Sequence, residues 1–203
     1  MVISNKFLVH FQTVDPLLYS LFNKYSLPEI KQENPKKYFS QLCGEIIGQQ
    51  LSGKVADVIC ARFEMLFPGK RVTPVGVLNL SEEKLRLTGM SWSKVSFIRD
   101  LAQQILTKSI QLDQLARLSD MEVIATLTKV KGIGPWTAEM FLMFTLGRED
   151  VFSYGDLGLR NAIKRIYGFK KDPSVRQMQK IVNAWKPYRT YAARILWKSL
   201  ERS

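Results

Sequence analysis

The sequence is poor in residues that bind metals and has no long apolar run. Its 203 residues include 2 cysteines and 1 histidine. Cys43 and Cys60 are too few for a four-cysteine iron–sulfur cluster, and with His10 they make a poor zinc site. No apolar run approaches the about 20 residues that span a bilayer, and the N-terminus lacks a signal-peptide pattern. We therefore expect an intracellular protein with no membrane partner and no metal held by side chains.

Acidic residues are also scarce. The chain has 18 Asp and Glu against 30 Lys and Arg, a net charge of +12, while its 46% hydrophobic content is that of an ordinary globular protein. The excess is spread along the chain, with no long basic run that would indicate a disordered tail. This balance favours a polyanionic partner, nucleic acid before membrane, although many RNA-binding proteins share it.

The apolar residues repeat at helical spacing, and no strand pattern is present, so we predict an all-α fold. Helix starts are indicated by a capping residue or a proline. Such signals occur at Asp15, Asn34, Ser52, Ser81, Ser91 and Ser119, and a further short helix is predicted from Leu112. The helix after Pro135 is apolar around nearly its whole circumference and is predicted to be buried. The last helix is predicted to start at Pro187.

Residues 129–135, Lys-Val-Lys-Gly-Ile-Gly-Pro, predict a helix–hairpin–helix. Gly132 and Gly134 permit a tight turn with positive φ and leave the backbone amides unobstructed. Pro135 suits the first position of the following helix, whose N-terminal N–H groups form a site for phosphate. Lys129 and Lys131 add positive charge. A Gly-x-Gly turn alone is weak, since similar turns join helices in many proteins.

Asp156 follows the apolar helix and stands directly before Leu159 and Ile163, which repeat at helical spacing. Its residue type and position predict a helix N-cap. Two further segments stand out: Gln49-Gln50-Leu51-Ser52 between two helices, and the segment 185–197, W-K-P-Y-R-T-Y-A-A-R-I-L-W. Taken alone, the glutamines suit a polar corner, and Trp185 and Tyr191 suit a helical core.

Taken together, these motifs resemble the helix–hairpin–helix glycosylase superfamily of base-excision repair. The hairpin with Asp156, the QQLS corner, the G-M-S-W-S-K phrase at 89–94 and the C-terminal W-x-P-x-R-x-YA-xxx-LW pattern resemble its alkylpurine, or 3-methyladenine, branch. The resemblance covers about residues 35–200. It implies two helical lobes with an active-site cleft between them and the hairpin at its mouth. One lobe would comprise about 1–50 plus 150–203, and the other about 51–149.

The resemblance also implies roles for individual residues. Asp156 would be the catalytic carboxylate as well as the cap. The base pocket would be lined by Trp136, Trp197, Tyr154 and Met140. The hairpin residues Lys129, Lys131, Gly132, Ile133 and Gly134 would hold DNA, and Gln50 would be the plug that fills the space left by the flipped base. Bifunctional relatives carry a lysine where this chain has Trp136, so a monofunctional enzyme is implied.

The implied partner is double-stranded DNA with damaged bases, bound by a monomer in the nucleoid or cytoplasm of a prokaryote or the nucleus of a eukaryote. The implied function is the flipping of alkylated purines and hydrolysis of their N-glycosidic bond. No cofactor is implied other than a monovalent cation at the hairpin backbone. Two alternatives remain open: a non-catalytic DNA- or RNA-binding module, and a glycosylase for another class of lesion.

Overall fold

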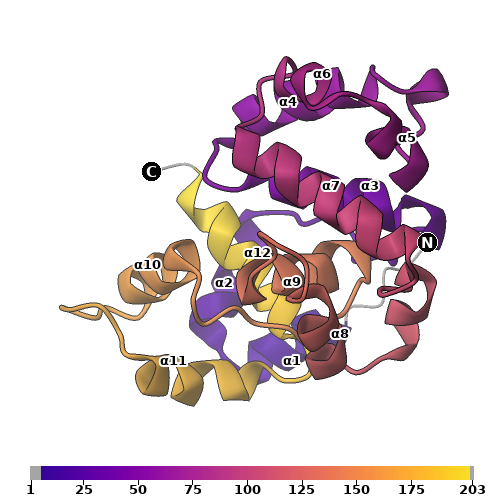
Figure 1. Ribbon diagram of the computed structural model, residues 1–203. Coiled ribbons are helices and arrows are strands. Elements are labelled where there is room, and N and C mark those ends of the chain that lie inside the picture. The colour runs from indigo at the N-terminus through magenta and orange to yellow at the C-terminus, as the bar shows by residue number, and fades with distance from the viewer. Residues whose placement is uncertain (1–5, 202–203) are drawn as a thin grey trace. The chain divides into compact units, whose positions relative to one another are not determined.

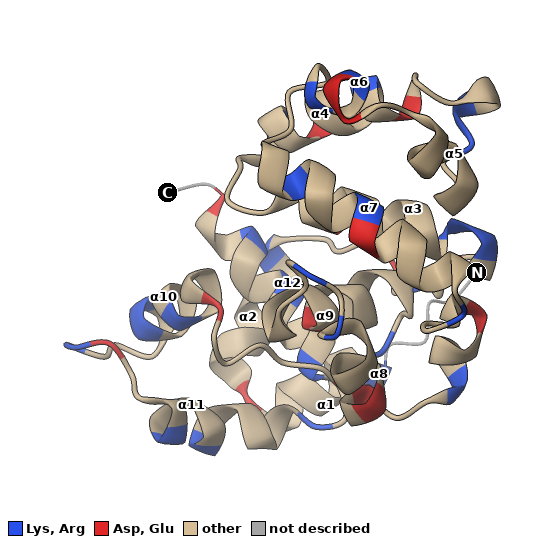
Figure 2. Cartoon of the chain, viewed as in Figure 1, with Lys and Arg blue, Asp and Glu red and all other residues tan. Residues whose placement is uncertain are grey.

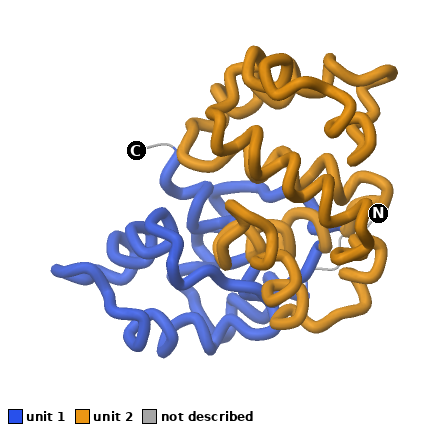
Figure 3. Tube along the Cα trace, in the orientation of Figure 1, with its two compact units in different colours: residues 1–31, 147–203 blue, residues 32–146 orange. Residues whose placement is uncertain are grey.

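The computed structural model describes residues 6–201, which form helices and turns and contain no β-strand (Figure 1). The all-α prediction is therefore confirmed. These residues divide into two compact units, which Figure 3 shows in different colours. Unit 1 comprises residues 1–31 and 147–203, and unit 2 comprises residues 32–146.

Unit 1 is built from both ends of the chain. Its helices are α1 (Lys6–Val14), α2 (Pro16–Lys24), α10 (Leu157–Ile166), α11 (Val175–Val182), η5 (Asn183–Trp185) and α12 (Arg189–Leu200). α12 packs against both α10 and α2, so the last helix joins the N-terminal helices to α10. Phe11, Leu18 and Trp185 are fully buried in this core.

Asp15 links three segments of unit 1. Its Oδ1 accepts a hydrogen bond from Leu18 N at 3.0 Å, which caps α2, and its Oδ2 accepts one from Trp185 Nε1 at 2.7 Å. The hydroxyl of Tyr167 donates to the same Oδ2. A nearly buried carboxylate is tolerated because three donors satisfy it. The cap predicted at Asp15 therefore also anchors residues 167 and 185.

Unit 2 holds the remaining helices. They are η1 (Pro35–Lys37), α3 (Tyr38–Gly48), α4 (Gly53–Glu64), η2 (Pro68–Lys70), α5 (Pro74–Asn79), α6 (Glu82–Arg86), α7 (Trp92–Leu106), η3 (Leu112–Arg117), α8 (Asp120–Leu127), α9 (Pro135–Met140) and the π-helical η4 (Phe141–Thr145). α7 is the longest and packs against α3, α5 and α6. Its buried face carries Val95, Ile98 and Ala102, as the spacing predicts.

The lobe boundary differs from the one expected from the sequence. Residues up to about 50 were expected in the first lobe, whereas the structure divides the chain between residues 31 and 32. α3 accounts for the difference, because it packs against α4, α7 and η4, all of which belong to unit 2.

Most predicted helix starts are confirmed by capping hydrogen bonds. The side chains of Asp15, Asn34, Ser81, Ser91 and Ser119 each accept a bond from a backbone N–H of the first turn. Ser52 stands at the N-cap of α4, but its side chain makes no such bond. Neither α1 nor α11 was predicted from the sequence.

Two predictions, one about the burial of a helix and one about where a helix begins, are wrong. The segment after Pro135 is not buried all round, since Trp136 is 39% and Phe144 46% exposed. It also changes from α-helix to π-helix at Phe141, which rotates the following side chains away from strict 3.6-residue spacing. The last helix begins at Arg189 instead of Pro187, with Tyr188 at the N-cap.

None of the helices formed by residues 6–201 has the length and hydropathy that crossing a bilayer requires.

Glu45 generates a pH-dependent prediction. Burial in unit 2 raises the pKa of this α3 carboxyl from its ordinary 4.5 to about 7. The folded state therefore binds the proton more tightly than the unfolded chain. The stabilisation is complete below pH 4.5 and is lost as the pH rises through 7.

Between pH 4.5 and 8, we expect the free energy of unfolding to fall by about 3 kcal/mol more in the wild type than in Glu45→Gln. Denaturant unfolding across this range measures the difference, with Glu83→Gln on exposed α6 as the control. Parallel pH profiles for wild type and Glu45→Gln would contradict the prediction.

Candidate active site and nucleic-acid interface

Asp156 is the N-cap of α10, as predicted. Its Oδ1 accepts a hydrogen bond from Leu159 N at 2.7 Å, and the residue is only 8% exposed. The backbone at Asp156 is extended, with φ −73° and ψ 122°, as is usual for an N-cap. The positive end of the α10 dipole therefore faces the carboxylate and stabilises its charge.

Trp197 of α12 holds the same oxygen. Its indole Nε1 donates to Asp156 Oδ1 at 3.0 Å. A Cβ on Gly158 would lie 3.1 Å from that Oδ1 and 3.2 Å from Trp197 Cδ1, so glycine leaves the space in which the indole reaches the cap. No role was expected for Gly158, although its position two residues after the capping aspartate could have indicated one.

The loop before Asp156 is fixed to the start of α12. Arg189 Nε donates to Asp150 Oδ1 at 2.6 Å, and its Nη2 donates to the Asp150 carbonyl at 2.7 Å. The hydroxyl of Thr190 accepts from Val151 N at 3.0 Å, and Thr190 N donates to the Glu149 carbonyl at 2.9 Å. The arginine of the C-terminal motif therefore holds the loop that carries the catalytic candidate, a role the sequence did not reveal.

Tyr154 lies within this same loop. Burial raises the pKa of its phenol, and the nearby Arg189 guanidinium, which hydrogen-bonds it, partly offsets the rise. Its ring packs edge-on against Phe152, with centroids 5.1 Å apart. Trp185 and Tyr191 are buried, which confirms their assignment to the core. Within unit 1, a hydrogen bond therefore joins Asp156 at the start of α10 to Trp197 of α12, and Tyr154 lies two residues before Asp156 in the chain.

The hairpin joins α8 to α9 in unit 2. Gly132 has φ 80°, which favours glycine, whereas Gly134 has φ −92° and forms the N-cap of α9. Pro135 occupies the first helical turn, as predicted. The expectation of positive φ is therefore correct for Gly132 and wrong for Gly134, where the absence of a Cβ leaves open space instead.

The hairpin side chains divide between surface and core. Lys129 and Lys131 are exposed, whereas Ile133 is 3% exposed and anchors the turn. Any contact of Ile133 with DNA would therefore involve its backbone. Asp100 of α7 accepts from Lys131 N at 3.0 Å, and the ring of Phe97 covers Gly132. Two side chains of α7, Phe97 and Asp100, therefore hold the hairpin in place, and neither was expected to do so from the sequence.

The QQLS corner is fixed to the hairpin through Gln49. Its Nε2 donates to the Gly132 carbonyl at 2.8 Å and to Thr137 Oγ1 at 3.0 Å. Lys94 Nζ donates to the carbonyls of Ile47 and Gln49 at 2.9 and 2.8 Å, which satisfies the C-terminal end of α3. The corner and the hairpin therefore form one connected surface within unit 2.

Gln50, the expected plug, has φ 58° and is exposed at this corner. A left-handed backbone is uncommon for a residue with a side chain, and it is often found at functional turns. On α9, Trp136 is 39% exposed, and Met140 one turn later is 4% exposed. The roles of these three residues toward DNA stay predictions.

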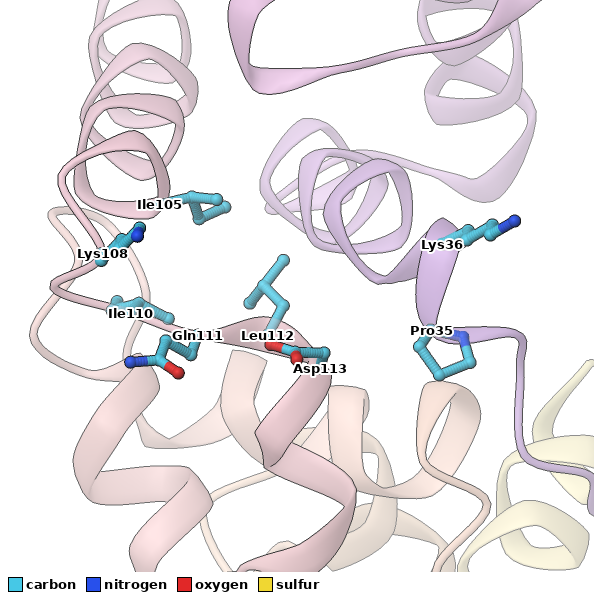
Figure 4. Close-up of a pocket in the computed structure, with 8 residues that line it drawn as sticks. All are labelled: Pro35, Lys36, Ile105, Lys108, Ile110, Gln111, Leu112 and Asp113. Carbon is cyan, nitrogen blue, oxygen red and sulfur yellow. The ribbon is translucent and has the colours of Figure 1, made fainter.

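Two other features of the described residues carry no candidate. They contain no group of three or more His, Cys, Asp or Glu side chains that could hold a metal ion. An open hollow of about 610 Å³ in unit 2, drawn in Figure 4, is lined by Pro35, Lys36, Ile105, Lys108, Ile110, Gln111, Leu112 and Asp113. None of these belongs to the hairpin or the QQLS corner.

The family model of the HhH-GPD superfamily base excision DNA repair proteins matches residues 43–187. The chain belongs to this superfamily. The matched residues include the QQLS corner, the hairpin and Asp156.

Individual relatives place the chain in the 3-methyladenine branch of the HhH-GPD superfamily. DNA-3-methyladenine glycosylase 1 of Schizosaccharomyces pombe is 34% identical over 166 residues, which are 81% of this chain and 73% of the relative. A Bacillus subtilis relative is 33% identical over 162 residues, 77% of this chain, but the match spans only 56% of that protein.

A solved structure of the S. pombe 3-methyladenine DNA glycosylase, in complex with abasic DNA, matches this fold with a TM-score of 0.87 and 30% identity. The match covers 98% of each chain.

The two hairpin glycines of this HhH-GPD protein should behave differently on substitution. A Cβ on Gly132 would lie 2.0 Å from Phe97 Cδ2 at φ 80°, whereas a Cβ on Gly134 would meet nothing within 4 Å. We expect Gly132→Ala to lower the free energy of unfolding by at least about 1 kcal/mol. Gly134→Ala should leave stability nearly unchanged and weaken duplex binding, because its methyl group lies where a phosphate would approach the amides.

Thermal melting and a duplex-binding titration on both variants check this. If Gly134→Ala binds DNA as tightly as wild type, the hairpin is a connector only.

Proposed function

We propose that this chain is a monofunctional DNA glycosylase that binds damaged double-stranded DNA as a monomer, flips out alkylated purines and hydrolyses their N-glycosidic bond. The observation that carries the proposal is the Asp156 carboxylate, which α10 and Trp197 hold at a helix N-terminus. Membership of the HhH-GPD superfamily and the names of its relatives support this activity. 3-Methyladenine and 7-methylguanine are the proposed substrates.

Asp156 stabilises the charge that develops in the reaction. Breaking the bond between base and sugar builds positive charge on the sugar, as in other glycoside hydrolyses. A fixed carboxylate offsets that charge and orients or deprotonates the attacking water. The hydrogen bonds from Leu159 N and Trp197 Nε1 fix its position before the substrate arrives.

Aromatic side chains suit an alkylated base. Alkylation at N3 of adenine or N7 of guanine makes the base cationic, so that it leaves readily and stacks well on an aromatic face. Trp136, Trp197 and Tyr154 are the candidates, each contributing about 0.5–2 kcal/mol of cation–π attraction. Met140 completes the proposed pocket. Trp136 stands where bifunctional relatives carry lysine, so the chain lacks the amine that would attack the sugar there.

Unit 2 carries the hairpin and the plug that are proposed to bind the duplex. The exposed Lys129 and Lys131 flank a hairpin whose backbone amides suit phosphate, and the exposed Gln50 is the proposed plug beside it. We propose that catalysis needs no cluster or metal cofactor, apart from a monovalent cation that the hairpin backbone could hold. The protein would act where the cell keeps its DNA.

A base-release assay tests this function. We expect the wild type to release free base from duplexes that contain 3-methyladenine or 7-methylguanine. Because position 136 lacks a lysine, the abasic strand should stay intact until alkali is added. Liquid chromatography of the free bases and denaturing electrophoresis of the strands measure the two products.

A matched undamaged duplex and a duplex with an oxidised purine are the controls. Tight binding with no base release from any duplex would instead favour the non-catalytic module. Release of the oxidised base alone would favour a glycosylase for another lesion class.

A further inference from the structure

Basic residues occur along the whole chain, but the net positive charge is concentrated in one segment of unit 1. Unit 1 has 16 Lys and Arg against 7 Asp and Glu, a net charge of +9, whereas unit 2, which carries the hairpin, has 14 against 11, a net +3. Within unit 1, residues 157–186 hold eight basic residues and one acidic residue, a net +7. The hairpin unit therefore accounts for little of the protein's charge.

The segment comprises α10, the connection at 167–174, α11, η5 and Lys186, and Figure 2 shows Lys and Arg on α10, the connection and α11. Lys170 and Lys171 in the connection are exposed, as are Arg176 and Lys180 on α11. Arg176 and Lys180 are four residues apart and share one helix face, while Met178 and Val182 are buried. We call Lys170, Lys171, Arg176 and Lys180 the α10–α11 basic surface.

Few of these charges are neutralised within the protein. The single acid of the segment, Asp172, accepts from Lys164 Nζ at 2.7 Å, and this bond holds the pKa of Asp172 below its usual range. Among residues 6–201, no ion pair involves any member of the α10–α11 basic surface. The Nε of Arg160, on α10, is buried and has no hydrogen-bond partner there. Close, uncompensated cations repel one another, so an anionic partner would stabilise this segment.

An open hollow lies beside this surface, lined by Asn161, Lys164, Arg165, Gly168, Phe169 and Lys170. The amide of Asn161 and the ammonium groups of Lys164 and Lys170 are donors of the kind that bind phosphate oxygens. Within residues 157–186, the exposed large apolar side chains are Leu157 and Val175. An interface with another protein would instead carry a central apolar patch.

We propose that the α10–α11 basic surface binds the phosphate backbone of duplex DNA, through residues that do not belong to the hairpin. This inference rests on the proposed function, because it supplies part of the grip on the same duplex. Backbone contacts of this kind carry no sequence information, and they dominate affinity through counterion release. The surface would therefore hold undamaged and damaged duplex alike, and would serve the search for lesions more than the chemistry.

The test removes two exposed charges at a time. Lys170→Gln with Lys171→Gln changes the basic surface, and Lys70→Gln with Arg71→Gln removes an equally exposed pair of charges from unit 2. Binding of an undamaged duplex is measured against salt concentration for wild type and both variants, after thermal melting has shown that each is folded. A second pair, Arg176→Gln with Lys180→Gln, repeats the test on α11.

We expect both basic-surface variants to reduce the slope of log affinity against log salt by about one to two, and to bind on the order of tenfold more weakly at about 0.1 M salt. The control pair should change the slope by less than half as much. If the wild type binds DNA and releases alkylated bases, but the basic-surface variants change the slope no more than the control pair does, this inference alone is overturned. A wild type that does not bind duplex DNA would overturn the proposed function as well.

Discussion

The candidate active site depends on one carboxylate oxygen. Oδ1 of Asp156 accepts from the Leu159 amide, which starts α10, and from the Trp197 indole, which comes from α12. The same contact therefore ends a loop, begins a helix and fixes the direction of the carboxylate. Gly158 leaves room for it, and Arg189 and Thr190 hold the preceding loop by hydrogen bonds to Asp150, Val151 and Glu149. The cap and the proposed catalytic group are one structure.

In unit 2, a few side chains hold both of the turns that are proposed to contact DNA, the QQLS corner and the hairpin. One helix, α7, bears Lys94 under the QQLS corner and Phe97 and Asp100 under the hairpin. Gln49 then joins the corner to the hairpin directly. Because both turns are held by the same helix, their spacing within unit 2 is set by packing, as a plug and a phosphate grip on one duplex would require.

The sequence predicts what local rules decide. Most of the helix starts were predicted from capping residues, and the hairpin was predicted from Gly132, Gly134 and Pro135. The burial of Trp185 and Tyr191 agrees with their interpretation as core aromatics. The catalytic role proposed for Asp156 came from the resemblance to a family. The sequence alone does not distinguish an aspartate that only caps a helix from one that also takes part in catalysis.

Contacts between distant residues could not be predicted from the sequence. The bond from Trp197 to Asp156 joins positions 41 residues apart, and that from Gln49 to Gly132 joins positions 83 apart. The π-helical segment Phe141–Thr145 lies within an apolar run that predicts a plain helix, and Trp136 before it and Phe144 within it are partly exposed. The uneven division of charge between the units became visible only when the fold assigned residues to each.

The rate of base release by Asp156→Asn tests the central claim most directly. Asparagine caps a helix as well as aspartate and can still accept from Leu159 N and Trp197 Nε1, so the variant should fold and bind lesion DNA. It lacks the negative charge, and excision should be at least about 100-fold slower than in wild type. Asp113→Asn, which removes an exposed acid outside the hairpin, the QQLS corner and the α10–α11 basic surface, should excise at the wild-type rate. A folded Asp156→Asn protein that releases alkylated bases as fast as wild type would show that the aspartate is only a cap.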